Sequence, residues 1–336
     1  MSTNTATATA KRQAHLTLWD RIDILKNKRF FSLVFPLSML VLVFAAFTVL
    51  TGGEFLKASV LKGIFNQSLI IGTMATAVCF IYTTGNIDFS VGAVMGLACT
   101  IGAMAYLATN NMMVMLVVTT LSGLALMLFN CTLSVTAGVK PAMVAIVAQS
   151  VYGAITTTLI GANPIGVDYS ACKALEGNYR YIVVIVYFVF CLIIYHRTEI
   201  GRKLRFIGGN EICAVQTGIN SIKCQYLAFL IAGIGVGIAG TFQTMRTANV
   251  AFNTGSGMGM DVMLATVLGG MSIFGGTKSN AYAGVIGAIT VTMLNKGLLM
   301  MGVSSTLIQG VRGIIFLLLV FLNSERQKTL PSRQQF

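Results

Sequence analysis

The sequence is poor in charge and in the residues that build metal sites or catalytic centres. Only 10% of its 336 residues are charged, and it contains two His, four Pro and one Trp. Its seven Cys are scattered without a Cys-x-x-Cys pair or a nearby His at metal-ligand spacing, so we expect neither a metal nor a cofactor. No Gly-x-Ser-x-Gly motif or His-Glu pair is present for hydrolytic chemistry. These absences predict that the chain is not an enzyme.

Apolar residues are the main component of the sequence. They make up 55% of the chain and give a mean hydropathy of +0.80, too apolar for a core surrounded by solvated faces. A membrane-spanning helix needs roughly 20 apolar residues. We therefore predict an all-α polytopic membrane protein with about ten transmembrane helices, with eight as the alternative. The apolar runs lie at 31–50, 62–84, 90–108, 112–130, 141–160, 180–196, 225–245, 259–276, 280–301 and 304–323.

The first apolar run has the basic flank of a signal peptide but not its length. Lys26, Lys28 and Arg29 precede a run longer than the apolar region of a usual leader, which has about 7–15 residues. We interpret it as an uncleaved first span. The predicted organisation is a polar and basic tail at 1–30, a transmembrane domain at 31–323 and a second tail at 324–336.

The basic residues sort by membrane side. Positive charge in short loops marks the cytoplasmic face, and Lys and Arg are found in both tails and in the loop 197–224. Ten spans then place both termini in the cytoplasm and the segment 161–178 outside. The formal charge of +13 is not gathered into one patch with interleaved aromatic residues. We therefore predict membrane lipid, and no nucleic acid, among the partners.

Two stretches of the sequence echo each other. Asp88-Phe-Ser-Val-Gly-Ala-Val-Met-Gly96 and Asp261-Val-Met-Leu-Ala-Thr-Val-Leu-Gly269 both place an acid eight residues before a glycine. In a ten-span arrangement they open the third and eighth spans from opposite sides, as a 5+5 inverted repeat requires. Chance similarity between helices rich in Gly and Val is the alternative.

The long cytoplasmic loop is predicted to hold a short helix. Asn210 can accept a backbone N–H bond at its start, Glu211 suits its positive end, and Gly218 can end it in a left-handed conformation. An isolated helix of about two turns is marginal in water, so it must dock on something. Ile212 and Val215 suit a groove on a cytoplasmic partner, and the alternative is docking on the protein's own spans.

Three stretches carry a resemblance to one known family. GRKLRFIGGNEICAVQTGI at 201–219 is similar to the cytoplasmic loop of the ribose/galactose-type permease family of bacterial ABC importers, with Thr217 where the family has Ser. GNIDFSVGAVMG at 85–96 resembles the family's Gly-Gly-Ile-Asp-Leu-Ser-Val-Gly, with Asn86 in place of the second Gly. Residues 260–313 resemble its C-terminal block.

This resemblance implies the permease subunit of an importer in the bacterial cytoplasmic (inner) membrane. The implied partners are ABC ATPase subunits, a periplasmic or lipid-anchored solute-binding protein, and a second permease copy or sister permease. The implied cargo is a pentose, a hexose or a related small solute. The residues implied to couple the permease to its ATPase are Gly201, Arg202, Ile207, Gly208, Gly209, Asn210, Glu211, Ala214, Gly218 and Ile219.

The sequence contains no complete motif for binding and hydrolysing ATP. GMSIFGGTKS at 270–279 faintly resembles a phosphate-binding loop, but Thr277 separates Gly276 from Lys278, and that loop needs Gly-Lys-Ser/Thr without a gap. ATP hydrolysis is therefore expected in partner subunits.

Polar residues inside the apolar runs are candidates for a translocation path. Ionisable groups are costly there, and Asp261 and Arg312 fall in the same half of the membrane, so they either pair or reach water separately at helix ends. Neutral polar side chains suit a weakly bound sugar, because its hydroxyls need hydrogen-bonding partners without full charge. The predicted path residues are Asn66, Gln67, Asp88, Ser90, Asn130, Asp261, Asn295 and Gln309.

Two other classes of protein fit the sequence less well. A secondary transporter could share ten spans and inverted repeats, but it would more often show a relay of buried acids, and it needs no capped helix in a basic loop. A polytopic membrane enzyme needs catalytic acids clustered at a membrane face, and the sequence has no such cluster.

Overall fold

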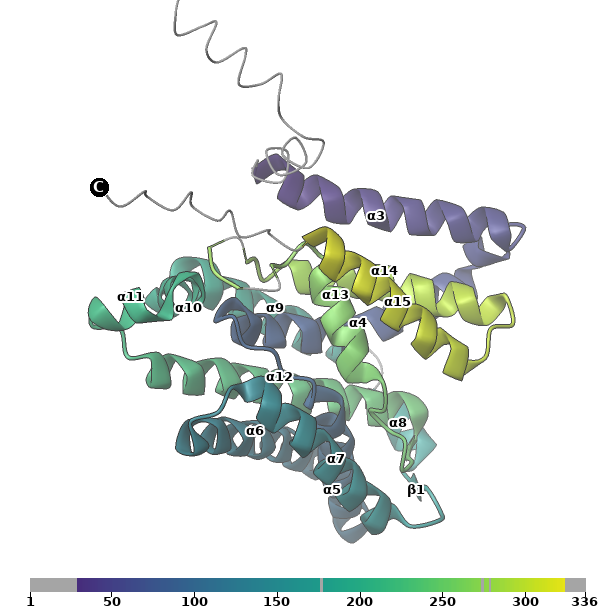
Figure 1. Cartoon of the computed structure of the whole chain (residues 1–336). Helices are drawn as coiled ribbons and strands as arrows, with labels where there is room; N and C mark the ends of the chain where they lie inside the picture. The colour runs from purple at the N-terminus through teal and green to yellow at the C-terminus, as the bar shows by residue number, and fades with distance from the viewer. Residues whose placement is uncertain (1–28, 176–177, 273–274, 278, 324–336) are drawn as a thin grey trace, which may run out of the picture.

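Helices form nearly all of the regular structure in the described part of the chain (Figure 1). The computed structural model describes residues 29–175, 178–272, 275–277 and 279–323, so the predicted tails fall almost wholly outside it. Ten helices overlap the ten apolar runs one for one. They are α3 (Arg29–Leu50), α4 (Ala58–Thr83), α5 (Val91–Thr109), α6 (Met112–Ala137), α7 (Pro141–Ile160), α9 (Asn178–Arg197), α12 (Ser221–Thr247), α13 (Met258–Leu268), α14 (Ala283–Met300) and α15 (Ser305–Asn323).

Seven of these helices are long and apolar enough to cross a membrane. Three more contain shorter apolar stretches, at Val34–Leu50, Met258–Leu268 and Ser305–Phe321. The remaining elements are short: η1 (Glu54–Leu56), β1 (Ile165–Gly166), α8 (Tyr169–Leu175), α10 (Glu199–Gly209), α11 (Glu211–Gln216) and β2 (Asn249–Val250).

The predicted span at 259–276 is helical only as far as Leu268. Gly270 has φ +86°, and Met271 N donates to Thr266 O at 3.0 Å, which is the bonding pattern of a helix ended by a left-handed glycine. α13 is therefore a short helix followed by an irregular segment, because two consecutive glycines interrupt the apolar run.

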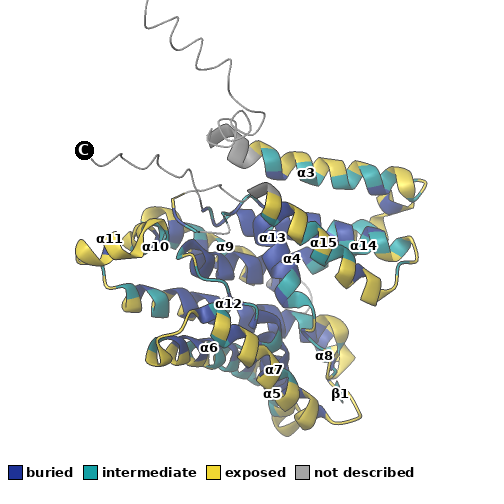
Figure 2. Cartoon of the chain, in the orientation of Figure 1, coloured by how far each residue is buried: buried dark blue, intermediate teal, exposed yellow. Residues whose placement is uncertain are grey.

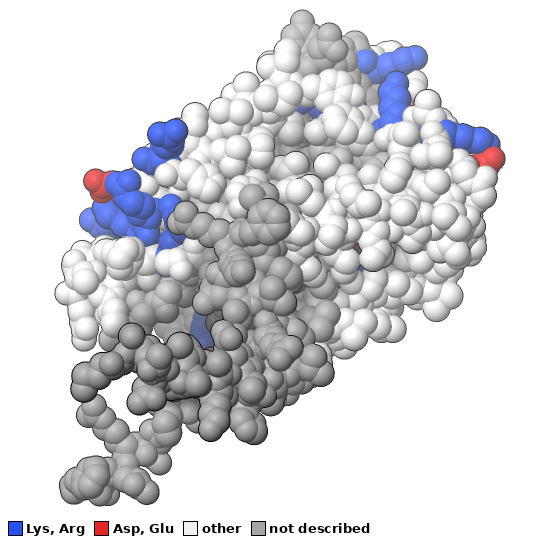
Figure 3. Space-filling model, turned by 90° about the horizontal axis from the view of Figure 1, so that it is seen from above, with Lys and Arg blue, Asp and Glu red and all other residues white. Residues whose placement is uncertain are grey.

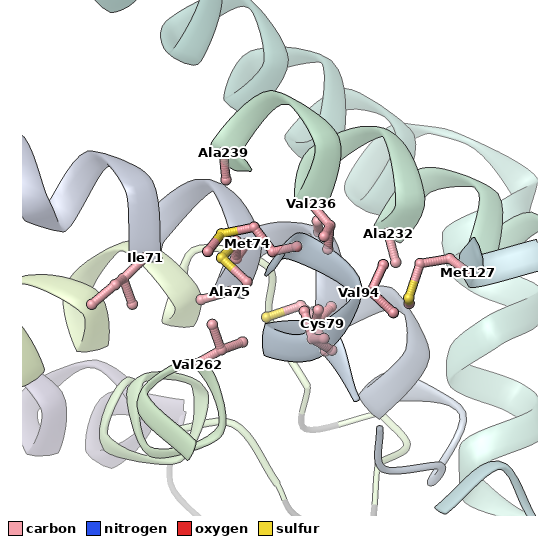
Figure 4. Close-up of a cluster of buried hydrophobic side chains, with 14 of the residues drawn as sticks. Ile71, Met74, Ala75, Cys79, Val94, Met127, Ala232, Val236, Ala239 and Val262 are labelled. Carbon is pink, nitrogen blue, oxygen red and sulfur yellow. The ribbon is translucent and has the colours of Figure 1, made fainter. Parts of the chain in front are cut away.

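α4 and α12 form the centre of the bundle. Both are largely buried, whereas α6 and α7 present exposed outer faces (Figure 2). Figure 4 shows Met74 of α4 close to Val236 of α12, and a side-chain carbon at Gly235 of α12 would lie 2.4 Å from the Cβ atom of Ala77 on α4. The small side chains in this core let helices approach closely, as is usual in membrane bundles.

Glycines bring α6 and α12 close together. A side-chain carbon at Gly123 would lie 3.0 Å from the Cα atom of Gly237, and one at Gly233 would lie 2.7 Å from the Cα atom of Leu124. Neither position can take a larger residue without moving one of the helices. Close backbone contact replaces side-chain interlocking along this interface.

Large apolar side chains point outward from the bundle. Met143, Ile146 and Val147 on α7 are 62%, 61% and 64% exposed. Such an apolar surface would promote aggregation in water, and together with seven helices long enough to span a bilayer it is typical of a protein that lies within a membrane. The chain is an all-helical polytopic membrane protein.

Two contacts join parts of the chain that lie far apart in sequence. β1 pairs with β2 in antiparallel register, Ile165 opposite Val250, and so ties the segment after α7 to the segment after α12. α3 packs mainly against α14, where the ring of Phe47 lies over Gly297, so close that a side-chain carbon there would be 2.3 Å from the ring.

Candidate coupling and translocation sites

α11 is a short helix that is capped at both ends. Asn210 has an extended backbone, and its side-chain oxygen accepts from Cys213 N at 3.1 Å. At the other end Gly218 has φ +85°, and Ile219 N donates to Ala214 O at 3.1 Å. Both features confirm the local prediction made for this loop, in which Asn210 begins the helix and Gly218 ends it.

α10 precedes α11 directly and was not predicted. It buries Gly201, Leu204 and Ile207, which recur every three residues along one face, and it leaves Arg202 and Phe206 exposed. The predicted two-turn helix is therefore the second half of a helical pair. The charged residues of α10 interrupt its apolar positions, so a search for long apolar runs does not detect this helix.

α11 contacts the bundle through one small residue. Ala214 is fully buried, whereas Ile212 is 71% exposed and Val215 is 52% exposed. Docking on the protein's own spans is confirmed for the face that holds Ala214. Docking on a partner stays a prediction, and Ile212 and Val215 lie exposed on the other face.

Charge on this pair of helices lies at the surface. Lys203 Nζ donates to Glu199 Oε2 at 2.9 Å, and this hydrogen bond lowers the pKa of Glu199 and raises the pKa of Lys203. Figure 3 shows the Lys and Arg side chains of the described residues in separate groups around a broad neutral surface. No continuous basic patch is visible on that face.

α10 is pressed against the end of α4. A side-chain carbon at Gly208 would lie 1.9 Å from Thr83 O and 2.5 Å from Gly276 N, whereas one at Gly209 would meet no atom within 4 Å. Gly276 N donates to Thr83 O at 2.9 Å. Three segments therefore converge at Thr83: α10, the end of α4, and the loop before α14.

Three of the predicted path residues form a continuous polar chain in the first half of the protein. Ser90 Oγ and Ser90 N both donate to Asp88 Oδ1, at 2.6 and 2.7 Å. Asn130 Nδ2 on α6 donates to Ser90 Oγ at 2.9 Å, and Tyr152 on α7 donates to Asn130 Oδ1 at 2.7 Å. All four residues are buried. We call Asp88, Ser90, Asn130 and Tyr152 the amino-terminal polar chain.

A second polar chain lies in the other half. Asn295 Nδ2 on α14 donates to Asp261 Oδ1 on α13 at 3.2 Å, and Arg312 Nε on α15 donates to Asn295 Oδ1 at 2.8 Å. Arg312 Nη1 also lies 3.1 Å from Asp261 Oδ1, so the ion-pair alternative for these two residues is confirmed. We call Asp261, Asn295 and Arg312 the carboxy-terminal polar chain.

The remaining predicted path residues join neither chain. Asn66 Oδ1 accepts from Arg180 Nη2 at 2.9 Å and from Tyr181 at 3.1 Å. Gln67 is half-buried and Gln309 is exposed. The sequence reading missed Tyr152, because an apolar run does not reveal which face of its helix a tyrosine occupies.

A cavity of about 160 Å³ lies between α4, α9 and α14. Phe65, Leu69 and Val285 are among its lining residues, and Thr76 contributes a buried hydroxyl without a hydrogen bond to the described residues. Its lining is mostly apolar, so it offers a sugar few partners. Such a lining suits hydrocarbon better than a polyol.

The fold and these sites define a class: a membrane permease, with buried polar chains between its helices and a helical pair exposed at one end. A family profile described as "Branched-chain amino acid transport system / permease component" matches residues 60–320. The chain belongs to this family. It is the permease subunit of an ABC importer, and it is not an enzyme.

Several proteins are similar to the chain over most of its length. The ribose import permease of Bacillus subtilis (strain 168) is 27% identical over 281 residues, covering 81% of this chain and 87% of that protein. The fructose import permease of Rhizobium meliloti is 28% identical, covering 80% and 78%. The D-allose transport system permease of Escherichia coli (strain K12) is 27% identical, covering 77% and 82%. No solved structure matches the chain.

Proposed function

We propose that the chain carries a small sugar or sugar-like solute across the bacterial cytoplasmic membrane, driven by ABC ATPase subunits that bind α10 and α11. The observation that carries this proposal is the pair of exposed apolar side chains, Ile212 and Val215, on a helix capped at both ends. A helix that is fixed on one face and apolar on the other is suited to dock in a groove. The sugar class is supported by the ribose, fructose and D-allose permeases similar to this chain.

The other partners follow from the same proposal. A solute-binding protein delivers the sugar at the end of the bundle opposite α10 and α11, where the β1–β2 pair and α8 lie (Figure 1). A second permease copy or a sister permease completes the pathway. Hydrogen-bonding side chains such as the buried Asn130 and the half-buried Asn295 favour a neutral polyol, since neither adds charge to the membrane interior.

We infer a topology of ten spans with both termini in the cytoplasm, arranged as two inverted repeats, α3–α7 and α9–α15. The two polar chains support this arrangement. Each has an acid at the start of the third span of its repeat, an Asn on the fourth span and a further donor on the fifth. A matched sequence of partners across three helices is hard to explain by chance similarity between Gly-rich segments. The transmembrane domain at 31–323 and the flanking tails at 1–30 and 324–336 remain our proposed division.

Cysteine labelling tests the topology. Cys213 is exposed on α11, whereas Cys172 and Cys224 are buried, so an impermeant thiol reagent should modify Cys213 from the cytoplasmic side. A Tyr169→Cys variant, at a position that is 64% exposed in wild type, should react from outside. Reaction of Cys213 from outside would contradict the topology.

Reconstitution tests the function. The permease is purified together with its co-expressed ATPase and binding protein and placed in liposomes, and uptake of labelled ribose, allose and fructose is measured with and without ATP. We expect ATP-dependent uptake of at least one sugar. Uptake without ATP by the permease alone would instead support a secondary transporter.

A further inference from the structure

Tyr195 lies near the end of α9, next to α10. Its side chain contacts two other segments, the end of α4 and the loop before α14. Its side chain is fully buried. Its hydroxyl lies 2.9 Å from Thr83 Oγ1, on the last residue of α4, and donates to Ser279 O at 2.8 Å in the loop before α14. Phe80 of α4 packs edge-on against the ring at 5.5 Å. The hydroxyl of one residue thus ties together α9, α4 and that loop.

The hydrogen bonds at this point outnumber the hydrogens available to make them. Thr83 Oγ1 also lies 2.6 Å from Cys79 O, so three contacts share two hydroxyl groups, and each hydroxyl has one hydrogen to donate. Three arrangements each make two of the three bonds. Thr83 donates to Tyr195 while Tyr195 donates to Ser279 O, or Tyr195 donates to Thr83 while Thr83 donates to Cys79 O, or each hydroxyl donates to its own carbonyl. They differ only in the rotation of two hydroxyl hydrogens, so no proton is gained or lost.

α10 contacts both members of the pair directly. Gly201 lies so close to Tyr195 that a side-chain carbon would be 2.0 Å from Tyr195 O. Arg205 Nη2 donates to the same carbonyl at 3.2 Å, and the guanidinium lies 5.2 Å from the centre of the Tyr195 ring. Seven residues after Gly201, about two turns further along α10, Gly208 lies directly against Thr83 O. A shift of α10 must therefore move Tyr195, Thr83 or both.

Thr83 in turn leads to the amino-terminal polar chain. The segment 84–90 follows it directly, and Tyr82 donates to Asp88 O at 3.2 Å. Coupling between distant sites needs packed elements with discrete alternative arrangements, and the hydroxyl pair provides such alternatives.

We propose that the Tyr195–Thr83 pair is the junction through which movement of α10 and α11 reaches the segment between α4 and α5, with Tyr195 as the positioning residue. The inference rests on the proposed function, in which the ATPase binds α10 and α11. The pair adds a specific route from that surface to the buried polar residues.

The test is a Tyr195→Phe variant in the reconstituted complex with its ATPase and binding protein. This change removes the hydroxyl and keeps the ring, so it leaves Thr83 bonded only to Cys79 O. We expect the rate of ATP hydrolysis to be kept while the amount of sugar taken up per ATP falls by about fivefold or more, within the usual range of coupling between sites.

The matched control is Tyr187→Phe. Tyr187 is buried on the same helix, and its hydroxyl donates to Ile231 O at 2.8 Å. It loses a similar hydrogen bond away from the coupling helices, so its uptake per ATP should match wild type. Equal ratios of uptake to hydrolysis in the two variants would overturn the inference. The unfolding temperature of each variant checks that both are folded.

A second variant tests the link between the two hydroxyls. Thr83→Val should lower uptake per ATP as Tyr195→Phe does, and the double variant should be no worse than either single variant, since both remove one link. Losses that multiply would contradict a shared junction.

The two proposals fail in different ways. If the wild-type complex takes up none of the sugars with ATP, the proposed function falls and the junction falls with it. If the wild-type complex transports and Tyr195→Phe keeps the wild-type ratio, the junction alone falls.

Discussion

The two polar chains have the same layout and different chemistry. In the amino-terminal chain Asp88 is held by Ser90, and the chain ends at the neutral Tyr152. In the carboxy-terminal chain Asp261 is held by Asn295 and faces the guanidinium of Arg312 at 3.1 Å. Among the described residues, Asp88 has no ion-pair partner, and its Oδ2 atom has no hydrogen bond.

This difference shows which half of the molecule depends on charge. A buried charge is tolerated when it is paired and becomes very costly when one partner is removed. The side chains of Asp261 and Arg312 are only 8% and 14% exposed, so their pairing should dominate the stability of that end. The amino-terminal chain instead depends on individual hydrogen bonds, each of which contributes less.

The largest effect is expected from Arg312→Met, which leaves Asp261 buried without its counter-charge. The free energy of unfolding should fall by about 3–5 kcal/mol, measured by denaturation of the purified permease in detergent. Adding Asp261→Asn should recover much of this loss, because the unpaired charge is then gone. A double variant no more stable than Arg312→Met would show that the ion pair is not the cause.

A smaller effect is expected from Asn130→Leu in the amino-terminal chain. The change leaves the hydroxyls of Ser90 and Tyr152 without their buried partner, which should cost about 1–3 kcal/mol. The same unfolding assay measures it. A loss as large as that of Arg312→Met would remove the distinction between the two chains.

Tyr152→Phe should cost less again, about 1 kcal/mol, because it removes one hydrogen bond at the end of the chain. The informative comparison is the same change made in the Asn130→Leu background. There the tyrosine has already lost its acceptor, so its removal should cost nothing further. An equal cost in both backgrounds would show that Tyr152 contributes through packing.

The smallest effect is expected from Glu199→Gln on α10, which breaks a fully exposed pair. Surface pairs contribute little. Lys203 lowers the pKa of Glu199, so any stabilisation is present at neutral pH and is lost as the pH falls through that pKa. The unfolding temperatures of the variant and wild type should therefore differ only slightly at neutral pH and agree in acid. A shift as large as that of Tyr152→Phe would mean that charge matters here independently of burial.

Hydropathy was sufficient to locate the ten helices that overlap the apolar runs, but it did not find the shorter α8 and α10. The ends of α11 were also predicted correctly, because Asn210 and Gly218 cap the helix through backbone groups only a few residues away in sequence. The end of α13 was missed, although the glycine pair at 269–270 was visible in the sequence. Glycines are common within membrane helices, so their presence alone does not mark an end.

The sites could be predicted only in part. Asp88, Asn130 and Asp261 were singled out because polar groups are costly in or beside membrane spans, and the structure places each of them in a polar chain, while their part in a translocation path stays a prediction. Tyr152 and Tyr195 were not, since a tyrosine among apolar residues reads as packing until its neighbours on other helices are known. The close approach of Gly208 to Thr83 depends on contacts between segments more than 100 residues apart, whereas periodic patterns are read within windows of roughly 11–18 residues.

The packing of α3 sets an order for assembly in the membrane. α3 is made early, yet its main partner, α14, is made near the end, and the ring of Phe47 has its place over Gly297 only then. Until that point α3 can make only its local contacts, in which Phe44 and Phe47 pack on Phe55 of η1, and the part that faces α14 is left to lipid or to the insertion machinery. The first described helix to emerge from the ribosome is thus among the last to reach its final packing. A translation arrest before α14 would leave α3 without its main helix contact, that of Phe47 with Gly297.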